Sequence, residues 1–186
     1  MILTKPQAYV LSLLADFRAL RTEQVKRLLA AQFRTTSAQA QALLHQLRIK
    51  GKIMIRDDCV MLPGRTVNPI VLRAFDVMLA LTDGCVAQIY GGNPPIVLVF
   101  TVSNDSKTNN GAEEQSAETV FGVVDGSSAH TTGLSGMSAG MRGISSDITL
   151  LFMLTDAEQS KTIDTKHKHY FALPDEQGHV RFFVDE

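Results

Sequence analysis

The side chains best suited to do chemistry gather between residues 34 and 56. They are polar or cationic and recur at spacings that suit one face of a helix and an adjoining hairpin; they are Arg34, Thr36, Ser37, Gln41, His45, Arg48, Lys52 and Arg56. Arg and Lys neutralise phosphates, whereas Ser, Gln and His hydrogen-bond to base edges in a groove of DNA. The set predicts a surface that binds double-stranded DNA. The alternative is a solvated basic face, which requires no such clustering.

The positions of the apolar residues indicate which elements hold these side chains. Thr36 lies three residues before Gln39, a spacing at which the two side chains cap the first turn of a helix reciprocally, and Gly51 ends that helix. Its buried face carries apolar residues spaced three and four apart, which are Ala40, Leu43, Leu44 and Leu47. After Gly51 the period changes to two, and Asp57-Asp58 makes the turn of a short hairpin.

Two further helices precede this one. Thr4 and Gln7 cap the first, and Thr22 caps the second, whose first turn begins at Glu23. Three closely spaced helices followed by a hairpin are typical of a winged helix. Residues 1–65 are therefore expected to form a winged-helix domain, with the third helix in a major groove and the hairpin on a phosphate backbone.

Charge divides the chain into two parts. Eleven Lys or Arg and four Asp or Glu residues occupy positions 1–65, a net charge of +7, whereas the remainder has seven and fifteen, a net charge of −8. This asymmetry indicates two domains and a polyanionic partner for the basic one. No apolar run reaches the ~18 residues that would span a bilayer, so no membrane contact is expected. A cytoplasmic location is expected, with Cys59 and Cys85 reduced.

Residues 66–186 are expected to form an α/β domain of about five strands, for which a degenerate restriction-endonuclease-like fold is one option. Asn68-Pro69 starts a helix that runs to Leu81 and is apolar on more than one side. The segments with strand composition are 86–90, 96–102, 119–124, 148–154, 170–173 and 180–184. A polar loop is expected from 103 to 118, and this domain is expected to bind a partner or form homo-oligomers.

Two patterns in the second half suggest ligand binding but lack a necessary residue. The glycines between 133 and 143 are spaced like those of a phosphate-binding loop, yet no Gly-Lys-Ser/Thr follows them, and a flexible loop or a poor helix is the better interpretation. His167, His169 and His179 lack a defined carboxylate ligand at short range, and Lys166 and Lys168 lie beside the first two. No metal or cofactor is therefore expected.

Catalytic patterns are incomplete in the same way. His130 lies beside two serines, but the Gly-x-Ser-x-Gly of a nucleophile elbow is absent. Asp125 ends a strand as the first carboxylate of a metal-dependent nuclease does, yet the strand at 148–154 carries no acidic-x-Lys partner. No catalytic residue is identified, and the chain is not expected to be an enzyme. A degenerate nuclease-like domain is the remaining catalytic alternative.

The opening LTKPQAYVLSLLADFRALRTEQVKRLL resembles the N-terminal winged helix of the replication-relaxation-like proteins of plasmids and conjugative elements in Gram-positive bacteria. The second half is similar in layout to a related group, through the segments NPIVLRAFDVMLAL, IVLVFTV, TVFGVVD, ITLLFMLTD and HYFALPDEQGHVRFFVD. The resemblance implies that the chain binds DNA of a mobile element and acts in its replication, transfer or regulation. The alternative is a protein-interaction adaptor whose winged helix docks on a protein partner.

Overall fold

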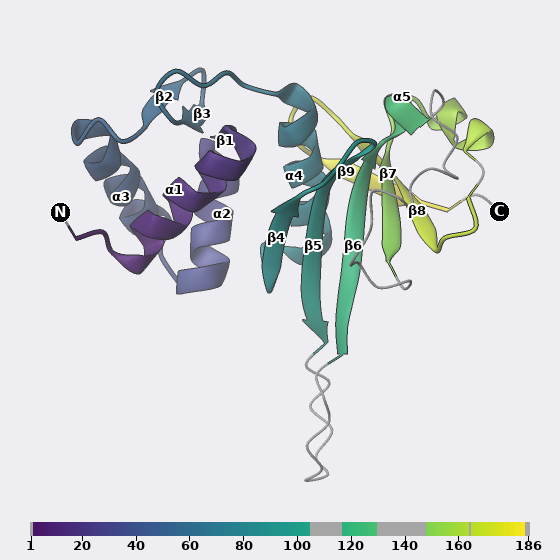
Figure 1. Ribbon diagram of the computed structural model, residues 1–186, viewed down its shortest axis with the longest axis horizontal. Helices are drawn as coiled ribbons and strands as arrows, with labels where there is room; N and C mark the ends of the chain where they lie inside the picture. Colours follow the sequence, from purple (N-terminus) through teal and green to yellow (C-terminus); the bar gives the residue numbers. More distant parts are fainter. Residues whose placement is uncertain (1, 105–116, 130–147, 164, 185–186) are drawn as a thin grey trace, which may run out of the picture. The chain divides into compact units, whose positions relative to one another are not determined.

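The computed structural model describes residues 2–104, 117–129, 148–163 and 165–184 (Figure 1). These residues form a mixed α+β protein, as the sequence predicts, with a three-stranded and a six-stranded sheet. The chain divides into two compact units, one comprising Met1–Cys85 with Gln177–His179 and the other Val86–Glu176 with Val180–Glu186. The boundary therefore follows residue 85, whereas the sequence led us to expect it after residue 65.

The described part of the first unit contains four helices and three short strands. They are α1 (Lys5–Phe17), β1 (Ala19–Arg21), α2 (Thr22–Phe33), α3 (Ser37–Ile49), β2 (Met54–Arg56), β3 (Cys59–Met61) and α4 (Pro69–Thr82). The strands form an antiparallel sheet in the order β1-β3-β2. We did not expect β1 from the sequence, because three residues are too few to show a period of two. Its pairing with β3, far along the chain, makes it a strand.

The predicted helix starts are confirmed for α1 and α3. The Thr4 hydroxyl accepts a hydrogen bond from the amide of Gln7 at 3.4 Å, and the Gln7 side chain accepts one from the Thr4 amide at 3.2 Å. Thr36 and Gln39 make the same pair of bonds at 3.3 and 2.9 Å. The prediction that Thr22 caps α2 is wrong. α2 begins at Thr22 itself, whose hydroxyl instead donates at 3.0 Å to a carbonyl in the turn between β2 and β3.

Polar and aromatic side chains join α4 to β1, α2 and α1, which is why the first unit extends beyond residue 65. Arg21 forms an ion pair with Asp76, whose side chain is only 7% exposed. Gln24 donates from Nε2 to the Asp76 carboxylate and to an α4 carbonyl, each at 2.7 Å. Phe17 meets Phe75 edge to face, with ring centroids 4.9 Å apart. These contacts place α4 in the core of the first unit.

The second unit is built on a six-stranded sheet in the order β4-β5-β6-β7-β8-β9. Its elements are β4 (Gln88–Gly91), β5 (Ile96–Asn104), β6 (Ala117–Asp125), α5 (Gly126–Ala129), β7 (Thr149–Met153), η2 (Ala157–Thr162), β8 (His169–Pro174) and β9 (Val180–Phe183). β6, β7 and β8 run parallel, and the other neighbours are antiparallel. Each predicted strand is present. β5 and β6 also reach into the segment that we expected to be a loop.

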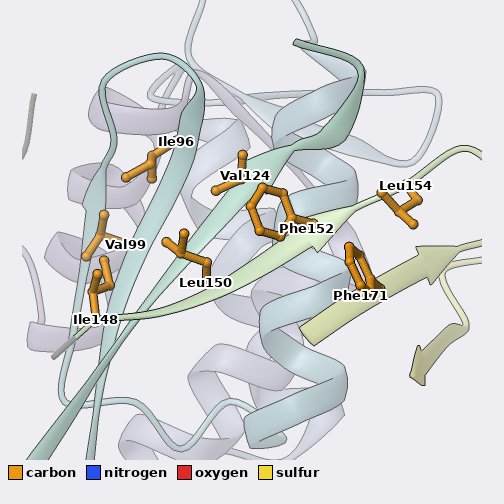
Figure 2. Close-up of a cluster of buried hydrophobic side chains, with 8 residues drawn as sticks. All are labelled: Ile96, Val99, Val124, Ile148, Leu150, Phe152, Leu154 and Phe171. Carbon is orange, nitrogen blue, oxygen red and sulfur yellow. The ribbon is translucent and has the colours of Figure 1, made fainter. Parts of the chain in front are cut away.

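One face of this sheet carries a cluster of buried apolar side chains, shown in Figure 2: Ile96, Val99, Val124, Ile148, Leu150, Phe152, Leu154 and Phe171. Val124, Phe152 and Phe171 are register neighbours on three adjacent strands, so their side chains point to the same side. Gly122 lies on this face too, and a Cβ there would come within 3.0 Å of the Ile148 side chain. The absence of a side chain at Gly122 therefore leaves room for the Ile148 side chain in the core.

Several sequence predictions fall outside the described residues. They concern the middle of the expected polar loop, at 105–116, the glycines between 133 and 143, and His130. None of the helices in the described ranges is long and apolar enough to cross a bilayer.

Candidate nucleic-acid interface

α3 presents the predicted DNA-binding side chains to solvent. Its other side is in the core, where Ala40, Leu44 and Leu47 are at most 1% exposed. The predicted contact residues on and just before the helix are all exposed; they are Arg34, Thr36, Ser37, Gln41, His45 and Arg48. Positions 37, 41, 45 and 48 are spaced four, four and three apart, so these side chains form one stripe along the helix.

The β2–β3 hairpin follows α3 directly. The Lys52 amide donates to the Leu47 carbonyl at 2.9 Å, which joins the start of the hairpin to the end of the helix. Asp57 and Asp58 have φ angles of 48° and 58°, as a two-residue type I′ turn requires. The first residue of α2 donates its amide and its hydroxyl to the Asp58 carbonyl, at 2.8 and 3.0 Å. The hairpin is thus fixed to two helices, and its Lys52 and Arg56 side chains are exposed.

Side chains of α1 hold α3 and the end of α2. Gln7 is 4% exposed, and its Nε2 donates to Oε1 of Gln46 on α3 at 3.2 Å. Tyr9 meets Phe33 edge to face, with ring centroids 5.4 Å apart. Burial raises the pKa of the Tyr9 hydroxyl to about 12, because the phenolate would lose its hydration. Since α2 also contacts α3, the orientation of α3 is set from two sides.

Ion pairs neutralise cations on β1 and α2, whereas most cations near α3 have no acidic partner among the described residues. Three ion pairs of the described structure involve β1, α2 and α4; they join Arg21 to Asp76, Lys26 to Glu23 and Arg27 to Asp83. No ion pair in the described ranges includes Arg34, Arg48 or Lys52. Arg56 pairs with Asp57 at 3.3 Å, but their side chains are 77% and 87% exposed, so water screens the attraction. The cations on and beside α3 and the hairpin are therefore largely unneutralised, as are Lys5, Arg18, Arg65 and Arg73 elsewhere in the described part of this unit.

His45 and Arg48 contact each other on the exposed side of α3. Arg48 Nη2 lies 3.4 Å from His45 Nδ1. A guanidinium group can only donate, so His45 Nδ1 is the acceptor and a neutral His45 carries its proton on Nε2. The contact leaves the Nε2–H of His45 and the other guanidinium N–H groups available as donors. Such donors suit phosphate oxygens and the acceptor atoms of guanine.

Two exposed residues beside the stripe were not among the predicted contacts. Lys50 directly follows α3 and adds a cation, which its position in the sequence could have indicated. Ile49 is the last residue of α3 and is 71% exposed. Helical spacing from the buried Leu47 places Ile49 outside the core face, so the pattern contained this signal as well. Thr36, in contrast, is exposed but uses its hydroxyl to cap α3.

The polar residues that we weighed as catalytic or metal-binding in the second unit make local hydrogen bonds. Asp125 is 5% exposed and accepts bonds from the Ser127 hydroxyl at 2.9 and 3.0 Å. His169 donates from Nδ1 to the His167 carbonyl at 2.8 Å and packs edge to face against Phe152. In the part of the chain that the structure describes, no three His, Cys, Asp or Glu side chains are grouped so that they could hold a metal ion.

Comparison of the chain with models of protein families, with curated proteins and with solved structures finds no match. The side chains and the geometry of the chain itself are therefore the basis for assigning a function. Within the described residues, the exposed side of α3 and the adjoining hairpin form the surface with the clearest chemical character.

Proposed function

We propose that this chain binds double-stranded DNA through its first unit, which acts as a winged helix. α3 would enter a major groove, and the β2–β3 hairpin would lie along a phosphate backbone. One observation carries the proposal. The polar stripe of α3 is exposed, contains Arg48 and is flanked by Arg34 and Lys52, and no ion pair of the described structure neutralises these three cations.

The length of the stripe suits a groove. Ser37 and Arg48 are eleven residues apart, which is roughly 16 Å of helix at 1.5 Å per residue. That length corresponds to about five base pairs at 3.4 Å each. Gln41 lies between them, and its amide can pair with N6 and N7 of adenine, whereas an arginine pairs with O6 and N7 of guanine. The stripe thus offers both base-reading chemistry and charge.

The hairpin supplies contacts that depend on charge alone. Lys52 and Arg56 are exposed, and each phosphate that a cation neutralises adds about 0.9 to the slope of log affinity against log salt concentration. Asp57 and Asp58 occupy the tip, where their carboxylates would repel phosphates. We therefore place the phosphate contacts before the tip, at Lys52 next to the end of α3 and at Arg56 on β2.

A salt titration tests this proposal. The full-length chain is mixed with a fluorescent duplex of about 30 base pairs, and the dissociation constant is measured between low and physiological salt. Four cations on or beside the interface, at Arg34, Arg48, Lys52 and Arg56, predict a slope of about −3 to −4. Replacing Arg48→Glu together with Arg56→Glu should reduce the magnitude of the slope by about two and weaken binding strongly at low salt.

The control changes the same amount of charge elsewhere. Lys168 and Arg181 are exposed residues of the second unit, and Lys168→Glu with Arg181→Glu alters the net charge equally. This control should leave binding close to that of the unmodified chain. Equal losses in both double variants, or no loss in the first, would contradict the proposed interface.

We further propose that this binding serves a plasmid or conjugative element, in its replication, transfer or regulation, and that the chain acts by binding rather than by catalysis. The resemblance of the opening segment and of the second half to proteins of such elements supports this context. The second unit would contact a protein partner or another copy. Preferential nuclease protection of replication-origin or transfer-origin DNA over random DNA would support this role, and equal protection of both would count against it.

The hairpin tip favours a second candidate function, that of a protein-interaction adaptor. Its paired carboxylates suit a cationic protein surface better than a phosphate backbone, and Met54 on β2 is 47% exposed. In that case the chain would form a defined complex with one partner protein. It would bind duplex DNA weakly at every salt concentration, so the same titration separates the two functions.

A further inference from the structure

The centre of the exposed side of α3 is mainly apolar. Four exposed residues recur at spacings of four, three and four along it; they are Ala38, Ala42, His45 and Ile49. These spacings place them on one face of the helix, away from the buried Leu44 and Leu47. Ile49 keeps 71% of its surface exposed, although a surface helix of a monomer usually carries polar residues there. An exposed apolar stripe of this kind is typical of a surface that binds another molecule.

The charges around this apolar stripe indicate which partner fits it. Arg34 precedes the helix, Arg48 lies beside Ile49, and Lys50 and Lys52 follow it. Within the described residues, ion pairs engage none of these four cations. A polyanion with an apolar feature between its charged edges is complementary to such a surface. Duplex DNA has this arrangement in its major groove, where thymine presents a methyl group between two phosphate backbones.

We infer that α3 reads thymine methyl groups through Ala38, Ala42 and Ile49, with Ile49 as a specificity-determining residue, so that the bound site is rich in A·T pairs. Apolar side chains such as alanine contact the thymine methyl in known recognition geometries. Ala38 and Ile49 are eleven residues apart, which is roughly 16 Å of helix and about five base pairs. The inference rests on the proposed function, because it names the DNA that this interface takes.

Removing only the methyl groups from the DNA tests the inference. The probes are two fluorescent duplexes of about 30 alternating A·T pairs, one with thymine and one with uracil at every thymine position. Burial of one methyl group changes an equilibrium constant about fourfold. The full-length chain should therefore bind the thymine duplex at least about fourfold more tightly than the uracil duplex, and 5-methylcytosine should strengthen its binding to an alternating G·C duplex.

A pair of variants connects this preference to the helix. Ile49→Ala keeps a good helix former at an exposed position, so folding should be unaffected. It should weaken binding to the thymine duplex about fourfold and narrow the difference between thymine and uracil. Leu81→Ala, which truncates an aliphatic side chain that is 42% exposed on α4, should leave both affinities unchanged.

Failure of the thymine inference and failure of DNA binding give different results. Steep salt dependence with equal affinity for the thymine and uracil duplexes would overturn the thymine inference and leave DNA binding standing. The thymine inference would fail in the same way if Ile49→Ala kept the full preference for thymine. Absence of binding to every duplex at low salt would overturn the proposed function, and the thymine inference with it.

Discussion

Arg21 and Arg48 are the same residue type in the same unit, yet their surroundings give them different roles. Arg21 has a side chain that is 26% exposed and pairs with the buried Asp76 carboxylate. Arg48 is exposed and contacts the neutral ring nitrogen of His45. Because a buried carboxylate satisfies the first guanidinium, it adds no positive field to the surface. Only the second remains available for a phosphate or a base.

Tyr9 makes a testable contribution to the pH dependence of stability. Burial raises its pKa to about 12, whereas the unfolded chain releases the same proton near pH 10. Between these values the folded state binds more protons, so the free energy of unfolding should fall as pH rises, by about 1.4 kcal/mol per pH unit. Denaturant unfolding at several pH values from 9 to 12 measures this slope.

Comparison of two Tyr→Phe variants isolates the effect of Tyr9. Tyr9→Phe should remove its share of the decline above pH 10, because phenylalanine has no proton to lose. Tyr90 is 48% exposed on β4, and Tyr90→Phe should leave the decline unchanged. The assignment would be wrong if the two variants followed the same curve.

At the scale of elements, local and distant interactions hold different parts of the first unit. α3 starts with a cap between residues three apart, and the hairpin closes through a two-residue turn. α4 instead depends on contacts with β1, α2 and α1, all more than forty residues earlier in the chain. Asp76 is central to these contacts, because its carboxylate accepts from both Arg21 and Gln24.

Asp76→Asn should therefore lower the free energy of unfolding of the first unit by about 3 kcal/mol. The neutral amide leaves the partly buried Arg21 without its counter-charge, and breaking such a pair from one side is costly. Asp83→Asn is the matched control. Its side chain is 89% exposed in an ion pair with Arg27, so the expected loss is below about 1 kcal/mol. Chemical denaturation measures both, and equal losses would show that Asp76 has no special role.

At the scale of the whole molecule, charge and compactness divide the chain at nearly the same place. Residues 1–85 contain twelve Lys or Arg and six Asp or Glu, a net charge of +6, and residues 86–186 contain six and thirteen, a net charge of −7. The compact units change at residue 85 as well. This charge division should draw a polyanion towards the first unit rather than the second, which is the direction that the proposed DNA binding requires.

The extent of the first unit leads to a prediction about fragments. A fragment of residues 1–85 should unfold cooperatively and bind duplex DNA. A fragment of residues 1–65 lacks α4, so Phe17 loses its contact with Phe75 and Arg21 loses Asp76. The shorter fragment should therefore unfold at a lower temperature and bind more weakly. Circular dichroism during heating measures the difference, and equal melting temperatures would place the boundary near residue 65 after all.

Much of the candidate interface could be predicted from the sequence, because its signals are local. The cap at Thr36 and Gln39, the buried spacing of α3 and the Asp57-Asp58 turn each involve residues within four positions of one another. All eight predicted contact residues are exposed in the structure. Ile49 was not among the predicted contacts, although its helical spacing from the buried Leu47 already places it outside the core face.

The sequence by itself determined the mixed α+β class, the order of most elements and the charge division, since composition and short-range spacing carry that information. Only the tertiary structure decided that α4 belongs to the first unit, that residues 19–21 form a strand, and that Arg21 is neutralised while Arg48 is not. Each of these depends on pairing between residues far apart in the chain. Such pairing leaves no periodic trace in either partner segment, so neither segment alone could reveal it.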